Sequence, residues 1–418
     1  MTYNCIIIGG GPAGILAALK ASEANGMVAI IEKNNILGKK LRITGKGRCN
    51  ITNDCDFDSL MSNIPGNPKF LFSSLKSFSN LDIIDFFNSI GLETVTERGG
   101  RVFPKSQKAG DVAGALVSVV KKKKNITLHM NTTVKDIIIE NGCVKGVVVK
   151  NDNSEITELY SNNVVCATGG ISYPLTGSTG DGYRFAENAG HSIITPHPSL
   201  AALISSNSFI KDLKGLSLRN ISISFKINNQ VVYEDFGELV FTDNGVSGPV
   251  ILSASAFYKK AANCVLSIDL KPALDEDKLY QRLQRDLEEF DRKLYCNSLD
   301  KLLPKKLIPV FILRSGISPN KQVNQLTKDE RLKIVHLLKN FTIDIKDIDD
   351  IKNAIVTAGG VNVKEINPKT MESKLCKGLY FAGEVIDVDG YTGGYNLTIA
   401  FSSGYTAGNS INQKSNDF

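Results

Sequence analysis

The stretch Cys5-Ile6-Ile7-Ile8-Gly9-Gly10-Gly11-Pro12-Ala13-Gly14 decides the fold of this 418-residue chain. A short apolar run, typical of a buried strand, leads into a GxGxxG pattern, and a helix-like segment follows over 15–25. Gly9 permits a tight turn, Gly11 lets the backbone approach a pyrophosphate, and Gly14 allows the helix to pack closely on the strand. The stretch therefore predicts a dinucleotide-binding turn.

A second strand is expected over 27–32, which completes a strand–turn–helix–strand unit. Glu32 stands at the end of this strand, where its carboxylate can accept hydrogen bonds from ribose hydroxyls. The amides at the helix N-terminus can bind phosphate. In this setting an incidental glycine turn is the weaker interpretation of the pattern.

The rest of the chain predicts a discontinuous cofactor domain. Asn141-Gly142 between two apolar alternations, 133–140 and 143–150, predicts a β-hairpin, and 163–167 reads as a buried strand. Helices are expected over 81–90, 275–294 and 328–340, and strands over 221–227 and 238–242. The glycine-rich character of the N-terminal part returns near 354. We expect cofactor-domain segments at 1–194 and 354–418, with an inserted substrate or cap domain at 195–353 that is β-rich and then helical.

Composition narrows the class of protein. The eight cysteines form no CxxC pair and no Cys/His cluster with zinc spacing, which predicts reduced thiols in a cytoplasmic protein and no metal site. No apolar run approaches the roughly 20 residues that cross a bilayer, so we expect no membrane-spanning helix. The net charge is +6, and the segment 39–48 holds five cations and no acid. Such a segment is either a solvated loop or a binding site for an anion.

Three further glycine-containing segments separate the cofactor classes, because GxGxxG is shared by NAD and FAD proteins. Ala167-Thr168-Gly169-Gly170 follows a buried strand, and Gly383-Glu384 and Gly393-Gly394-Tyr395-Asn396 lie near the C-terminus. These segments resemble those with which two-dinucleotide-binding-type flavoproteins hold FAD. In that group the C-terminal segment meets the flavin, where glycines let backbone amides approach the ring.

A more specific resemblance covers nearly the whole chain. Leu37-Gly38-Lys39-Lys40, Gly47-Arg48-Cys49-Asn50, Gly100-Arg101-Val102-Phe103-Pro104, Ser172-Tyr173-Pro174 and Gly177-Ser178-Thr179-Gly180-Asp181-Gly182 are similar to segments of the aminoacetone-oxidase-like bacterial flavoproteins. That family includes proposed ribosomal RNA dihydrouridine synthases. The resemblance implies an α/β fold with a discontinuous Rossmann-like FAD-binding domain and an inserted domain of β-strands plus helices.

Carried over position by position, the resemblance implies a set of contacts to non-covalently bound FAD. These contacts are expected from Gly9, Gly11, Ala13, Gly14, Glu32, Lys33, Lys40, Gly47, Arg48, Val134, Thr168, Gly169, Gly383, Glu384, Asp387, Gly394, Tyr395, Asn396 and Leu397. Within this set, Lys40 and Arg48 could neutralise the pyrophosphate through charge-assisted hydrogen bonds.

Cys49 and Tyr395 are the candidates for the catalytic acid. Cys49 follows Arg48, and a neighbouring cation lowers the pKa of a thiol. The competing interpretation is that Cys49 is a structural residue packed under the flavin. For His191 and His197, contact with substrate competes with an ordinary role in a loop.

These observations predict an FAD-dependent oxidoreductase that takes hydride from NAD(P)H and passes it to an electron-poor carbon. The resemblance implies three substrate classes: a uridine in ribosomal RNA, a small amine oxidised by oxygen, and an enone in a steroid-like molecule. Segment 39–48 and the positive charge favour ribosomal RNA over a small-molecule substrate, although the same cations would serve FAD phosphates. A non-enzymatic flavin redox sensor is the fourth alternative.

Overall fold

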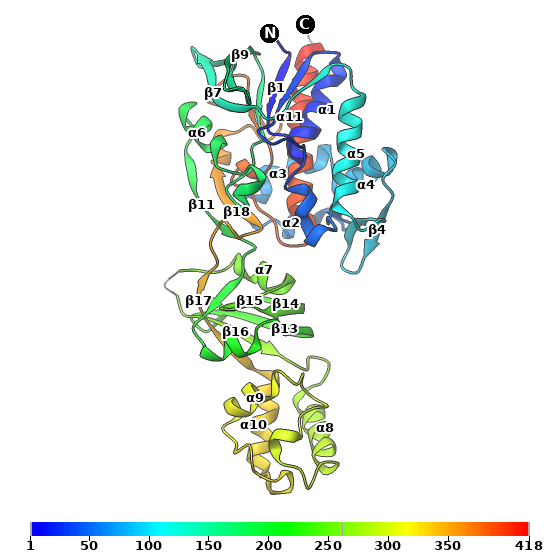
Figure 1. The fold of residues 1–418 in the computed structure, drawn as a ribbon, viewed down its shortest axis with the longest axis vertical. Coiled ribbons are helices and arrows are strands. Elements are labelled where there is room, and N and C mark those ends of the chain that lie inside the picture. Colours follow the sequence, from blue (N-terminus) through cyan, green and yellow to red (C-terminus); the bar gives the residue numbers. More distant parts are fainter. Residues whose placement is uncertain (1, 261, 417–418) are drawn as a thin grey trace. The chain divides into compact units, whose positions relative to one another are not determined.

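The computed structural model describes residues 2–260 and 262–416. Its contacts divide the chain into two compact units (Figure 1). The first unit combines Met1–Ser199 with Ile351–Phe418, and the inserted unit is Leu200–Asp350. Each unit has its own hydrophobic core.

A five-stranded parallel sheet forms the centre of the first unit, in the order β19-β10-β1-β2-β6. All residues of β1, β2, β10 and β19 are buried, as expected where helices or loops cover both faces of a parallel sheet. Because β1 pairs with β2 on one side and β10 on the other, the strand order reverses beside β1, and ligands bind at such switch points. The bounds are β1 (Cys5–Ile8), β2 (Val28–Ile31), β6 (Ile126–His129), β10 (Val164–Cys166) and β19 (Leu379–Phe381).

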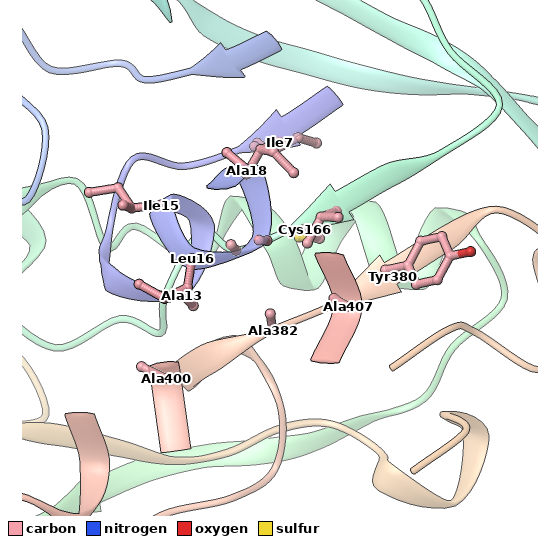
Figure 2. Close-up of a cluster of buried hydrophobic side chains, with 14 of the residues drawn as sticks. Ile7, Ala13, Ile15, Leu16, Ala18, Cys166, Tyr380, Ala382, Ala400 and Ala407 are labelled. Carbon is pink, nitrogen blue, oxygen red and sulfur yellow. The ribbon is translucent and has the colours of Figure 1, made fainter. Parts of the chain in front are cut away.

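Helices α1 (Pro12–Ala21) and α11 (Tyr395–Asn416) lie side by side against this sheet (Figure 1, blue and red). Small residues permit the close approach: a Cβ on Gly404 would clash with the backbone of Ala13, and one on Gly408 with the carbonyl of Ala17. Figure 2 shows Ala13 and the alanines of α11 in the same buried cluster. The first and last helices of the cofactor unit therefore pack nearly backbone to backbone.

Smaller elements surround the sheet. The predicted hairpin is confirmed, and Asn141 and Gly142 at its turn have φ values of 49° and 72°. The antiparallel groups are β7 (Thr133–Glu140), β8 (Cys143–Lys150) and β9 (Ile156–Tyr160); β3 (Thr52–Asn53), β5 (Arg101–Pro104) and β4 (Thr94–Glu97); and β11 (Ile193–Ser199) with β18 (Val356–Val361). Further helices are α2 (Phe57–Ser62), α3 (Pro68–Ser77), α4 (Asn80–Ser89), α5 (Ala109–Lys122) and α6 (Asp181–Asn188).

The inserted unit is a closed barrel with attached helices. Going round the barrel, β12 (Leu203–Ser205), β15 (Gly245–Ser247), β14 (Gln230–Phe241), β13 (Ser217–Ile227), β16 (Cys264–Asp269) and β17 (Phe341–Ile348) are neighbours. Closure comes from β12, which pairs with both β15 and β17. Its helices include α7 (Pro249–Ser255), α8 (Glu276–Glu288), α9 (Ile308–Ser315) and α10 (Lys328–Lys339).

Local patterns located α4, α8 and α10, but they predicted neither α7 nor α9 and did not show how the barrel closes. Capping boxes begin α4 at Ser79 and α10 at Thr327, close to the predicted starts. The helix expected over 275–294 ends earlier, at Glu288. The last barrel strand, β17, follows the helices, so the inserted unit is not simply strands followed by helices. None of the helices in the described part of the chain combines the length and apolar character needed to span a bilayer.

Replacing Gly404 with Ala is expected to destabilise the first unit by about 1–3 kcal/mol, because the added methyl group must displace the backbone of Ala13. Gly114→Ala in α5 is the matched control. Gly114 is exposed with no atom near its Cβ position, so this change should stabilise by about 0.5–1 kcal/mol. Thermal melting followed by circular dichroism compares the two variants. Equal melting temperatures for Gly404→Ala and the wild type would contradict the packing argument.

Candidate cofactor and active site

The glycine turn after β1 contains two kinds of glycine. Gly9 has a φ of +106°, and a Cβ there would clash with the carbonyl of Ala167; a Cβ on Gly14 would clash with the carbonyl of Gly9. Gly11 differs, because no atom lies within 4 Å of its Cβ position. Gly11 is also the N-cap residue of α1, and Pro12 is the first residue of the helix. A glycine has no side chain that could accept a hydrogen bond from the first helical amides. The amides at this helix end therefore face open space, as a phosphate site requires.

Glu32 points back at this turn from the end of β2. The side chain is 8% exposed. Its Oε2 accepts a hydrogen bond from the amide of Gly10 at 2.8 Å, and Oε1 accepts from the amide of Asn34 at 2.8 Å. A carboxylate has about four lone-pair sites, so Glu32 keeps acceptor capacity for ribose hydroxyls. The amide of Thr132 donates to the Glu32 carbonyl at 3.0 Å, which places buried Val134 two residues from the same edge.

Distant segments meet at the N-terminus of α1. Gly9 packs on Ala167 and Thr168, directly before Gly169. Gly383 begins the turn η8 (Gly383–Val385) with a φ of +77°, and a Cβ there would crowd the side chain of Ala13. The structure thus brings together the first, second and third glycine clusters that the sequence predicted for one site.

The last glycine cluster lies against β3. A Cβ on Gly394 would clash with the backbone of Thr52. Asn396 holds its own loop, because its Oδ1 accepts from the amide of Gly390 at 2.9 Å and its Nδ2 donates to the Gly390 carbonyl at 2.6 Å. Leu397 is half-buried. Gly47 stands apart in an exposed turn, with a φ of +84° and no atom near its Cβ position.

The cations expected at the pyrophosphate carry partners within the protein. Lys40 Nζ lies 2.7 Å from Glu384 Oε2 and donates to Ser172 Oγ at 2.6 Å. Glu384 Oε1 also accepts from Ser172 Oγ at 2.9 Å and from the amide of Thr357 at 2.8 Å. Lys33 pairs with Asp181 at 2.6 Å. Lys40 is therefore a link between four segments rather than a free cation.

Arg48 is paired as well. Its guanidinium contacts the carboxylate of Glu97 and the amide oxygen of Gln107, and it stacks 4.2 Å from the centre of the Phe103 ring. Within segment 39–48, Lys39 and Lys46 are the cations whose side chains are exposed. Carboxylates distant in sequence therefore offset two of the five charges of this segment, those of Lys40 and Arg48.

The structure gives no support to a thiolate at Cys49. Its side chain is 0% exposed, and burial raises the pKa of the thiol to about 12. Arg48 does not offset this, since its guanidinium turns to Glu97. Cys49 therefore has the surroundings of a core residue.

The other acid–base candidates differ in accessibility. Tyr395 is buried, and desolvation together with Cys55 raises the pKa of its hydroxyl to about 12. His191 is also buried; its Nε2 contacts Ser373 Oγ at 2.7 Å, and burial lowers its pKa. Contact between His191 and substrate is therefore ruled out by packing. His197 is exposed on β11.

Several buried polar atoms of the first unit have no hydrogen-bond partner among the described residues, and three of them stand in or near the predicted cofactor motifs. Arg42 Nε, Asn50 Oδ1 and the Tyr183 hydroxyl are buried, and none has a hydrogen-bond partner among the described residues. Leaving such a group unpaired costs about 1–3 kcal/mol, so a bound molecule is expected to satisfy some of them. Asn50 is the last residue of the motif Gly47–Asn50, and Tyr183 directly follows the motif Gly177–Gly182. Neither was predicted as a site residue from the sequence. Together with the open face at Gly11, they fit a bound dinucleotide.

Among the described residues, no group of three or more His, Cys, Asp or Glu side chains could hold a metal ion.

Cys49 is expected to resist thiol reagents at neutral pH in the folded protein, because the thiol is buried and protonated. Labelling with a maleimide followed by peptide mass spectrometry measures this. Cys143, which is partly exposed, is the internal control and should be labelled first. Rapid labelling of native Cys49 would restore it as a catalytic candidate.

Two relatives and one solved structure are similar to nearly the whole of this chain. A 3-dehydro-bile acid delta(4,6)-reductase of Clostridium scindens is 31% identical over 96% of this chain and 97% of that protein. A ribosomal RNA dihydrouridine synthase of Haemophilus influenzae is 29% identical over 98% of each chain. The crystal structure of 3-ketosteroid delta1-dehydrogenase from Sterolibacterium denitrificans has a TM-score of 0.57 at 15% identity, covering 99% of this chain and 100% of that one, and shares the fold.

The family model of the HI0933-like protein Rossmann domain matches residues 3–410, almost the whole chain. The match includes the glycine turn, the inserted unit and the C-terminal glycine cluster. The chain therefore belongs to the HI0933-like family of Rossmann-fold flavoproteins and is an FAD-dependent oxidoreductase.

Proposed function

We propose that this enzyme reduces a carbon–carbon double bond conjugated to a carbonyl group, and that its substrate is a uridine in ribosomal RNA. The observation that carries the reaction type is the pair of full-length relatives. Dihydrouridine synthesis and delta(4,6) reduction of a 3-dehydro-bile acid act on different molecules, yet both saturate a double bond activated by a carbonyl. A uracil ring and a dienone share this feature.

The same relatives decide how the alternative substrates are ranked. Ribosomal RNA is favoured by a relative that aligns over 98% of both chains and by the exposed cations Lys39 and Lys46. A steroid-like enone is the second candidate, because the bile acid reductase is 31% identical. Oxidation of a small amine has no counterpart among these relatives. The non-enzymatic sensor is set aside, since the chain belongs to a family of oxidoreductases.

We infer that FAD binds along the glycine clusters of the first unit. Gly11 and the N-terminus of α1 receive the pyrophosphate, and Glu32 receives the ribose. Bound FAD supplies a hydride to the substrate after its own reduction, for which we propose NAD(P)H. The protein's task is then to hold the electron-poor carbon in place and to deliver a proton.

The inserted unit Leu200–Asp350 is our candidate for the substrate domain. All eight cysteines carry free thiols, which suits a reducing compartment, so we propose the cytoplasm.

Deleting the gene is expected to remove one dihydrouridine from ribosomal RNA, and the purified enzyme with NAD(P)H should restore it in RNA from the deletion strain. Reverse transcription after borohydride treatment maps the position. Binding to a single-stranded substrate should weaken with salt, with a slope of about −0.7 per neutralised phosphate. If the deletion leaves dihydrouridine unchanged and the enzyme reduces a 3-oxo-diene steroid, the results favour the second candidate, a steroid-like enone.

Gly11→Val is expected to lower FAD affinity by more than about 100-fold, or roughly 2.7 kcal/mol, without harming the fold, because the side chain enters open space that the pyrophosphate needs. Gly14→Val is the contrast. Its side chain meets the Gly9 carbonyl, so the fold itself should melt earlier. Flavin absorbance and the melting temperature of FAD-free protein separate the two effects. Retention of FAD at wild-type affinity in Gly11→Val would move the phosphate site elsewhere.

A further inference from the structure

The loop after η8 holds an aspartate in a fixed position beside β18. The amide of Asp387 donates to the carbonyl of Val361 at 3.0 Å. Asn67 Nδ2 donates to the Asp387 carbonyl at 2.7 Å and to Asp387 Oδ2 at 3.0 Å. These contacts clamp both the backbone and the side chain, while the side chain remains only partly buried.

A second carboxyl group lies two residues further on. Asp389 is 8% exposed, and its Oδ2 accepts a hydrogen bond from Ser199 Oγ at 2.7 Å. Gly66 packs so closely that a Cβ there would clash with Asp389 Oδ1. The loop therefore places one carboxyl group in the interior and a second, Asp387, nearer the surface.

The surroundings shift the pKa of both groups upward. Burial raises the pKa of Asp387 and of Asp389, and the charge of Asp387 raises the pKa of Asp389 further. Among the described residues, neither carboxyl group forms an ion pair with Lys or Arg, and the charge interaction with His197 on β11 lowers the pKa of both. Glu384, three residues before Asp387, forms an ion pair with Lys40.

An independent feature indicates that a ligand approaches this place. The hydroxyl of Tyr183 on α6 has no hydrogen-bond partner among the described residues, and the side chain is 8% exposed. The charges of Glu384 and Asp387 both act on this hydroxyl. A buried hydroxyl that has no hydrogen-bond partner among the described residues can donate to an acceptor atom of a bound molecule.

We propose that Asp387 is the proton donor in substrate reduction and that His197 returns the proton from solvent. The proposal rests on the proposed function. Hydride adds to the carbon β to the carbonyl, the electron pair of the double bond moves to the α carbon, and the Asp387 carboxyl proton adds there. The carboxylate left behind regains a proton from solvent by way of His197. The two electrons come from NAD(P)H.

The other acids considered do not fill this role. Cys49 is sealed in the core, and burial raises the pKa of Tyr395 to about 12. Asp389 is more buried than Asp387, and its carboxyl group already accepts a hydrogen bond from the Ser199 hydroxyl. Asp387 combines partial exposure, a raised pKa and a neighbouring exposed histidine.

Asp387→Asn preserves the shape of the side chain but has no proton to give. Two rates are measured in single-turnover experiments and normalised to bound flavin: the rate of substrate reduction and the rate of flavin reduction. The quantity compared between variants is the first rate divided by the second. We expect this ratio to fall by about 100-fold or more, and Asp387→Glu to recover part of the loss. Wild-type substrate reduction should slow as the pH rises through the raised pKa of Asp387, and the residual rate of Asp387→Asn should lose this dependence. Asp54→Asn, an exposed carboxylate of the same unit, is the matched control.

A second readout does not depend on turnover. In FAD-free protein labelled with carboxyl-¹³C aspartate, the resonances of Asp387 and Asp389 should titrate above the usual range of Asp, and one of the two should vanish in Asp387→Asn. Wild-type failure to reduce both the ribosomal RNA and a 3-oxo-diene steroid would overturn the proposed function and this proposal with it. If the wild type turns over and Asp387→Asn has an unchanged rate ratio, the role of Asp387 alone is overturned. The same holds if no raised aspartate resonance disappears in Asp387→Asn.

Discussion

The close approach of backbones around the N-terminus of α1 is the constraint on which the cofactor unit depends. Gly9 meets Ala167, Gly14 meets Gly9, and Gly404 meets Ala13, each at a distance that a Cβ could not tolerate. Because the chain is packed so tightly on these sides, the helix end is held rigidly. The side facing Gly11 stays open. One short turn thus acts as both a packing centre and a receptor for an anion.

Electrostatic pairing extends this arrangement to the edge of the site. Lys40 and Glu384 are 344 residues apart in sequence, and their contact joins the N-terminal and C-terminal segments of a domain that the inserted unit interrupts. Ser172 and Thr357 complete the network. A half-buried ion pair with full hydrogen bonding avoids the cost of an unpaired charge, so its value here is to fix geometry more than to add stability.

Carboxyl groups of the same unit differ in their partners. Lys40 pairs with Glu384, whereas Asp387 and Asp389 are desolvated without a Lys or Arg partner in the described chain. Desolvation without a compensating cation disfavours the charged form of a carboxyl group. Reduction of an activated double bond needs a proton donor, and the uncharged carboxyl group is the form that can give a proton.

Sequence alone determined the parts of this protein that depend on local geometry. The glycine turn, the Asn141-Gly142 hairpin, the buried parallel strands and the starts of α4 and α10 follow from φ preferences, periodicity and capping, which act over a few residues. Only the tertiary structure decided which groups are buried or paired. It places Cys49 in the core and pairs Lys40 with Glu384 and Arg48 with Glu97. It also closes the barrel with β17 and leaves the Tyr183 hydroxyl without a hydrogen-bond partner among the described residues. The physical reason is that burial and charge pairing are set by residues far away in sequence. A cation next to Cys49 in the chain therefore says little about the proton affinity of its thiol.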